Sequence, residues 1–187
     1  MKKLVVLWAA VLCACPAFAG DKGILKLSLW DDIAVALPNN TQTVRGVDLG
    51  IGSNTDSIYG LQLDLIASKA DEVRGFNEAF IYARSNELYG LQGAIYNVSN
   101  NLYGIQGGLV AVNNRELRGF EGGWINSAHG TLIGAQLGIY NQVEDLHGAQ
   151  IGIVNNARHI CKGFQVGIVN IAKNGWFPVM VLVNGRF

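Results

Sequence analysis

Three stretches near the C-terminal end of the chain are copies of one pattern: GAQLGIYN (134–141), GAQIGIVN (148–155) and GFQVGIVN (163–170). Each begins with a glycine, and the same glycine recurs through most of the 187-residue chain. The nine anchor glycines, spaced 14 or 15 residues apart, are Gly46, Gly60, Gly75, Gly90, Gly104, Gly119, Gly134, Gly148 and Gly163. A short, fixed period is typical of repeat proteins, in which each unit buries its apolar side chains against its neighbours.

The residues of each repeat can be named by their offset from the anchor glycine, so that each offset defines a column through the nine repeats. Columns +1 and +5 are apolar in every repeat, column +2 is polar in every repeat, and column +4 is small in most. This alternation predicts one β-strand per repeat, with Asn, Asp, Ser and Gly in the intervening turns. We therefore expect an all-β fold with columns +1 and +5 in its core, and expect Ile139→Asp or Ile153→Asp to prevent folding.

A parallel β-solenoid is the architecture that this pattern favours. In such a fold each repeat is one coil, and equivalent residues stack about 4.8 Å apart. Stacking favours columns of identical amides, because each amide can donate to the next. The predicted ladder residues are Gln92, Gln106, Gln136, Gln150 and Gln165 in column +2, and Asn141, Asn155 and Asn170 in column +7. The prediction is a parallel β-solenoid of nine 14–15-residue repeats with flanking terminal strands.

The alternative is a 12-strand antiparallel outer-membrane β-barrel. Strands at 24–30, 33–37 and 179–187 would raise the nine repeat strands to an even number, as bacterial barrels have. The chain also ends in Phe187, after alternating valines. Against this alternative, column +3 is glycine at 93, 107 and 122 and glutamate at 78, which leaves few apolar residues for a lipid-facing strand. Antiparallel pairing between 134–140 and 148–154 would favour the barrel.

The first residues have the features of an export signal. Lys2 and Lys3 precede an apolar run, and 17–19 is a small-x-small cleavage site, which places the mature start near Gly20. A lipoprotein signal acylated at Cys15 is an open alternative. We expect 1–19 to be a signal peptide, 20–43 an N-terminal strand or cap, 44–173 the nine-repeat β domain and 174–187 a C-terminal strand or cap. The mature protein would be located at the surface, in the outer membrane or in the periplasm of a bacterium.

The sequence offers little catalytic chemistry. No spacing of histidines or cysteines fits a metal site, and no motif calls for a cofactor, so the prediction is that the protein is not an enzyme. Asp64 and Glu78 could face each other on adjacent strands as a glycosidase pair, which is the weak enzymatic alternative. After cleavage Cys161 is the single cysteine, and its apolar column predicts a buried core thiol. The net charge is zero with no basic patch, which argues against nucleic acid as a partner.

Column −1 is the candidate surface for a ligand or partner. It contains a mixture of aromatic and basic residues: Arg45, Tyr59, Arg74, Tyr89, Tyr103 and Arg118. A row of this kind suits a polysaccharide, the cell envelope or a protein partner, and the simpler alternative is a solvated sheet face. Membrane association is also possible for a chain with so few charged residues, 15% in all.

The repeat resembles a family of bacterial surface repeat-containing proteins of the leptospiral type, built on GLQxGLxN units. GLQGAIYN (90–97) and the three stretches quoted above carry the resemblance, which extends over 24–187 through LKLSLW (25–30) and WFPVMVLVNGRF (176–187). The chain departs from the motif at Asp64, Asn77, Glu78 and Gly93. The resemblance implies an exported, surface-associated protein without enzymatic activity.

Overall fold

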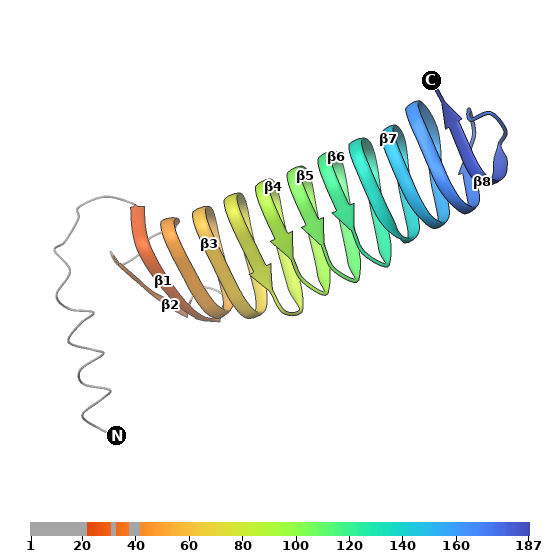
Figure 1. Ribbon diagram of the computed structural model, residues 1–187. Helices are drawn as coiled ribbons and strands as arrows, with labels where there is room; N and C mark the ends of the chain where they lie inside the picture. The colour runs from red at the N-terminus through yellow and green to blue at the C-terminus, as the bar shows by residue number, and fades with distance from the viewer. Residues whose placement is uncertain (1–21, 31–32, 38–41) are drawn as a thin grey trace.

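The computed structural model describes residues 22–30, 33–37 and 42–187, which form an elongated stack of coils (Figure 1). The expected signal peptide at 1–19 and Cys15 lie outside the described residues. The strands are β1 (Lys22–Trp30), β2 (Ile33–Leu37), β3 (Thr43–Ala79), β4 (Tyr82–Gly93), β5 (Tyr96–Gly107), β6 (Val110–Gly122), β7 (Ile125–Ala172) and β8 (Val179–Arg186). Because β3 has 37 residues and β7 has 48, each continues through more than one repeat.

Consecutive repeats pair in parallel, as the solenoid prediction requires. Strands β3 to β7 form parallel pairs in which each residue faces its equivalent one repeat later. Gly90 pairs with Gly104, for example, and Gln92 with Gln106. The fold is therefore a parallel β-solenoid, and the antiparallel pairing that the alternative needed does not join these repeats.

The anchor glycines form a continuous spine along the stack. All nine have a positive φ, between 139° and 155°, a backbone conformation that side chains with a Cβ rarely adopt. A Cβ added to Gly104 would lie 2.0 Å from the carbonyl oxygen of Gly90, and similar collisions recur from Gly60 to Gly163. The period of the sequence thus follows from the backbone, since one position in each coil accepts only glycine.

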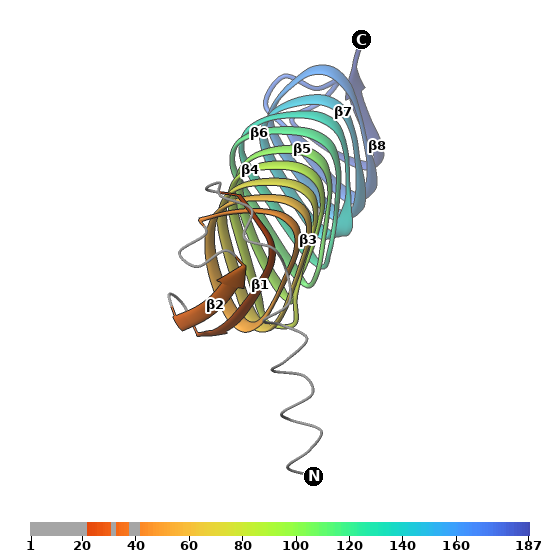
Figure 2. The same cartoon turned by 90° about the vertical axis from the view of Figure 1, so that its left-hand side faces the viewer.

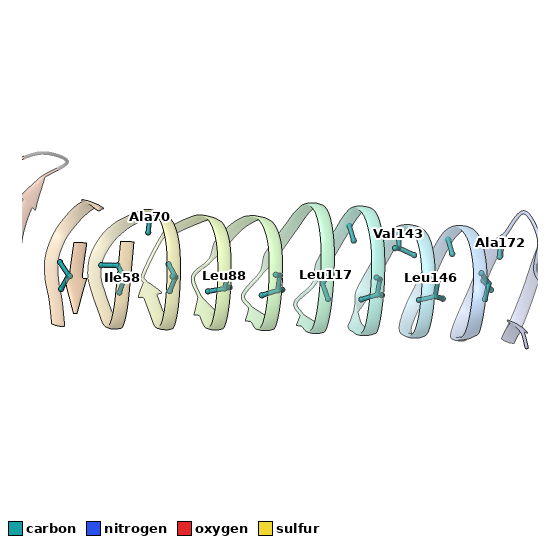
Figure 3. Close-up of a cluster of buried hydrophobic side chains, with 14 residues drawn as sticks. Ile58, Ala70, Leu88, Leu117, Val143, Leu146 and Ala172 are labelled. Carbon is teal, nitrogen blue, oxygen red and sulfur yellow. The ribbon is translucent and has the colours of Figure 1, made fainter. Parts of the chain in front are cut away.

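The interior is narrow and half polar. Its apolar part is column −2, in which Val44, Ile58, Val73, Leu88, Leu102, Leu117, Leu132 and Leu146 are all 0% exposed. Figure 3 shows these side chains in a row along one side of the stack, with small residues such as Ala70 and Ala172 in a second row. The rest of the interior is the polar columns +2 and +7, whose Gln and Asn residues are also buried.

The prediction that columns +1 and +5 form the core is wrong. Every residue of column +5 is exposed, from 39% for Ile51 to 68% for Phe80, and Ile139 and Ile153 are each 47% exposed. The reason is parity: side chains alternate along a strand, and columns −2 and +2 point inward together, which turns columns +1, +3 and +5 outward. These three columns are named the outer apolar face below. Aspartate at 139 or 153 therefore need not prevent folding.

The prediction of a buried Cys161 is also wrong. Ile160, 14 residues after Leu146, fills the next inward position and is 0% exposed. The longer spacing before Gly163 inserts one residue after Ile160, so that Cys161 faces solvent as a free thiol.

The two ends of the stack carry antiparallel strands. β1 pairs in parallel with β3 and antiparallel with β2, while β8 pairs antiparallel with the last part of β7. Figures 1 and 2 show β2 and β8 at opposite ends of the solenoid. Among the described residues, no helix has the length and apolar character needed to span a membrane.

Candidate functional site

Column −1 forms a stacked row of rings and guanidinium groups across six repeats. Tyr89 and Tyr103 stack with ring centroids 4.8 Å apart and planes within 5° of parallel. The Arg74 guanidinium lies between two tyrosines, 5.6 Å from the Tyr59 ring and 5.1 Å from the Tyr89 ring. Arg45 and Arg118 close the two ends, against Tyr59 and Tyr103 respectively. The six predicted surface residues thus make one continuous aromatic–cationic ladder.

A second row, of acidic side chains, borders this ladder. Glu72 accepts hydrogen bonds from Arg74 Nε at 2.6 Å and from Tyr59 Oη at 3.1 Å. Glu116 accepts in the same way from Arg118 Nε at 2.7 Å and from Tyr103 Oη at 2.9 Å. Sequence reasoning missed this row, although each of the two glutamates stands two residues before its arginine.

The acidic row affects the ionisation of the ladder. The hydrogen bond from Arg118 is the main cause that lowers the pKa of Glu116 below its ordinary value. The hydrogen bond to Glu116 is the main cause that raises the pKa of Tyr103. Both groups are partly open to solvent, so these pairs contribute little to stability. Their effect is to fix the orientation of the side chains.

Internal stacking determines what the ladder can offer to a partner. The tyrosine ring faces are covered by the next ring or guanidinium, and the hydroxyl groups donate to the acidic row, which leaves ring edges and the terminal guanidinium N–H groups toward solvent. A sugar therefore has no free ring face to stack on. A partner at this surface would have to be bound through hydrogen bonds and would meet the fixed spacing of the repeats.

Amide ladders occupy the interior. Gln165 donates from Nε2 to Oε1 of Gln150, and Gln150 donates likewise to Gln136, both at 2.8 Å. The Asn column forms a second ladder of 2.8 Å bonds, from Asn126 through Asn141 and Asn155 to Asn170. Each amide satisfies its neighbour, which removes most of the cost of burying it.

Gln92 and Gln106 do not continue the glutamine ladder. Each accepts a 2.7 Å hydrogen bond from a buried serine of the preceding repeat, Ser85 and Ser99 respectively. Farther along, the corresponding inward residues include Ala128 and carry no hydroxyl group. Whether a glutamine bonds to a hydroxyl or to the next glutamine therefore depends on its interior neighbour.

Glu121 interrupts the glutamine column with a buried carboxyl group. It is 0% exposed, and its Oε2 accepts from Gln136 Nε2 at 2.6 Å. Among the residues that the structure describes, its Oε1 has no hydrogen-bond partner, and neither has Nε2 of Gln106 in the adjacent repeat. Burial raises the pKa of Glu121 from 4.5 to about 7.

A cluster of charged groups lies inside the first repeats. Thr55 Oγ1 donates to Asp48 Oδ2 at 2.8 Å and accepts from Lys26 Nζ at 2.7 Å. Ser53 Oγ donates to Asp64 Oδ2 at 2.5 Å, and burial raises the pKa of Asp64 to about 7. Sequence reasoning named Asp64 as a departure from the motif and as a possible partner of Glu78, but not as part of this cluster, because nothing in the pattern places Lys26 of the N-terminal strand inside the coil.

The described residues give no support to the carboxylate pair of the enzymatic alternative. Asp64 is buried, whereas Glu78 in column +3 points outward, so the two lie on opposite sides of the chain. Within residues 22–30, 33–37 and 42–187, no three His, Cys, Asp or Glu side chains gather as a metal site would require. One shallow hollow of about 240 Å³, lined in part by His129, Glu144 and Arg158, is below the usual size of a small-molecule site.

Comparison with protein-family models, with curated proteins and with solved structures finds no match to this chain. The β-solenoid fold is therefore what the structure establishes, and the likeness to the surface repeat family rests on the sequence motif alone.

Proposed function

We propose that this chain is an exported, non-catalytic structural or adhesive repeat protein of a bacterial surface or envelope. The observation that carries the proposal is that the recurring residues of the repeat hold successive coils together. These residues are the nine glycines, the two amide ladders and the leucine-rich column −2. β-Solenoids of this kind are suited to long, regular surfaces. The signal-like start at 1–19 and the resemblance to surface repeat proteins support the same conclusion.

Within this proposal, the aromatic–cationic ladder is the adhesive surface. Its free groups are the terminal guanidinium N–H groups of Arg45, Arg74 and Arg118, which lie two and three coils apart, or about 10 and 14 Å. These groups match a polymer that presents hydroxyl and carboxylate groups along its length, such as an envelope polysaccharide. Arginine binds carboxylates through paired N–H donors, which favours an acidic sugar.

Export and surface location can be tested directly in the producing cell. Mass spectrometry of the purified mature protein should find an N-terminus near Gly20, and protease added to intact cells should digest the protein. An intact Met1, or complete protection of a protein that remains inside the cell, would contradict export. An acylated Cys15 would instead identify a lipoprotein.

The adhesive role can be tested with the purified mature protein and isolated envelope polysaccharide. Arg74→Ala combined with Arg118→Ala should weaken retention on the immobilised polymer at least about tenfold, because two paired-donor sites are lost. Arg158→Ala is the matched control, since Arg158 forms an exposed ion pair with Glu144 outside the ladder. Equal retention of the double variant and the control would exclude the ladder as the binding surface.

A further inference from the structure

The outer apolar face is a large hydrophobic surface that the described segments of the chain leave exposed. Its side chains are exposed in repeat after repeat, among them Leu65 at 65%, Trp124 at 62% and Ile168 at 61%. Nine coils at about 4.8 Å, each contributing about six residues at about 3.3 Å, give a surface of about 800 Å². Monomeric proteins rarely expose apolar patches larger than about 300–600 Å².

The outer apolar face is uneven in the central repeats. Column +3 is glycine at Gly93, Gly107 and Gly122, while column +5 carries Leu109 and Trp124 beside it. A Cβ added to Gly107 would come no closer than 3.8 Å to another atom, and one added to Gly93 no closer than 3.9 Å. At Gly93 and Gly107 a strip without side chains therefore runs beside a row of bulky ones and lets a second sheet approach closely, whereas the Phe120 ring covers Gly122.

We propose that the outer apolar face is the interface between two copies of this chain. The area of about 800 Å² per copy equals what a stable interface of standard size buries on each partner. A two-fold axis that is parallel to the solenoid axis and passes over column +3 sets column +1 of each copy over column +5 of the other, and the column +3 glycines over one another. Contacts are then reciprocal, as in a symmetric dimer, and sheets pack face to face at about 10 Å.

The charges beside the face argue for a protein partner rather than a lipid surface. Interfacial membrane binding uses an excess of Lys and Arg around an apolar face. Here Arg74 and Arg118 in the adjoining column are paired with Glu72 and Glu116, and the whole chain has zero net charge. A border of paired charges suits the polar rim of a protein interface. Column −1 borders the contact as this rim, and the side of its ladder that faces away from the partner copy stays accessible.

Sedimentation of the mature protein tests the proposal. The wild type should form a dimer at micromolar concentration, and Gly107→Leu should weaken dimerisation at least about tenfold because it fills the strip where the two sheets approach closely. Asn114→Leu, which adds the same side chain at an exposed position elsewhere, should leave the dimer unchanged. Circular dichroism of each variant shows whether the coil has formed. Leu109→Ser, which shortens the bulky row, gives an independent measurement of the same contact.

Flotation with phosphatidylcholine vesicles separates the dimer from a lipid-binding face. If the face binds a second copy, an additional leucine at position 107 lowers the affinity of the dimer. If the face binds lipid, the same leucine raises the fraction of protein that floats with the vesicles. A wild type that stays monomeric at about 100 µM, a Gly107→Leu variant that dimerises as well as the wild type, or flotation that increases in this variant would each overturn the proposal.

Discussion

Replacing Glu121 by glutamine should stabilise the protein at neutral and alkaline pH. Glu121 is the one acidic group between glutamines in column +2, and its pKa in the folded state is raised from 4.5 to about 7. In the unfolded chain the carboxyl group loses its proton near pH 4.5, whereas in the folded protein it keeps the proton to about pH 7. The contribution of this group to the free energy of unfolding is therefore fully present below about pH 4.5 and is lost as the pH rises through 7.

The size of the effect follows from the difference between the two pKa values. A carboxyl group that titrates near 7 instead of 4.5 accounts for about 3 kcal/mol of unfolding free energy lost above pH 7. Glutamine at 121 cannot ionise, and its amide can also donate to Gln106 in the direction that the rest of the ladder uses. The variant should match the wild type at pH 4.5 and exceed it by about 3 kcal/mol at pH 8.

Urea denaturation of the mature protein at pH 4.5, 6 and 8 measures this difference. Asp64, also buried with a raised pKa, is present in both proteins and contributes the same pH dependence to each. Gln150→Glu is the converse control, because it places a second buried carboxyl group in the column and should become less stable as the pH rises. The reasoning fails if Glu121→Gln shows the same pH dependence as the wild type.

Three further predictions use the same unfolding and labelling measurements. Gly104→Ala should destabilise the protein by more than about 3 kcal/mol, because its Cβ would lie 2.0 Å from a carbonyl oxygen, whereas Gly93→Ala has free space and should change stability by less than about 1 kcal/mol. Ile139→Asp should fold with a cooperative thermal transition, whereas Leu132→Asp, at a position that is 0% exposed, should not. Equal thermal unfolding of the two variants would mean that column −2 is not the buried column. Cys161 should react with a maleimide in the native protein as fast as in urea, and protection in the native state would contradict its exposure.

The period of the sequence predicts the architecture well, and for a physical reason. Identical side chains stacked along an axis leave identical columns in the sequence, and Gln136, Gln150 and Gln165 differ by one repeat each. Their amides bond directly to one another, as the parallel arrangement requires. The glycine at position zero recurs because its backbone conformation admits no other residue.

The same pattern does not reveal which side of the strand is buried. Apolar columns usually face the core, and this expectation led to the wrong assignment of Ile139 and Ile153. Column −2 shares its parity with the glutamines, so the leucines and the amides face inward together. A stacked repeat can bury amides because each amide has a neighbour of its own kind, which an isolated strand lacks.

Features that depart from the repeat are hardest to predict from sequence. Glu121 looks like a conservative replacement for glutamine, and only the structure shows that its carboxyl group is buried with Oε1 unpaired among the described residues. Lys26 belongs to a different segment from Thr55, so their hydrogen bond depends on how β1 joins the stack. The acidic row beside the ladder likewise follows from side-chain orientation rather than from the period.

The antiparallel strand β8 has a consequence for how molecules of this protein meet end to end. The edge of each coil carries backbone N–H and C=O groups that can pair with another parallel strand. Stacking of coils can therefore continue wherever such an edge stays uncovered. β8 occupies the edge of the last coil in the opposite chain direction, with Gly163 facing Arg186 and Gln165 facing Asn184. A chain shortened to residue 173 would expose that edge, while β2 would still cover β1 at the other end of the stack. The few residues of β8 thus close one of the two edges through which molecules could otherwise join end to end.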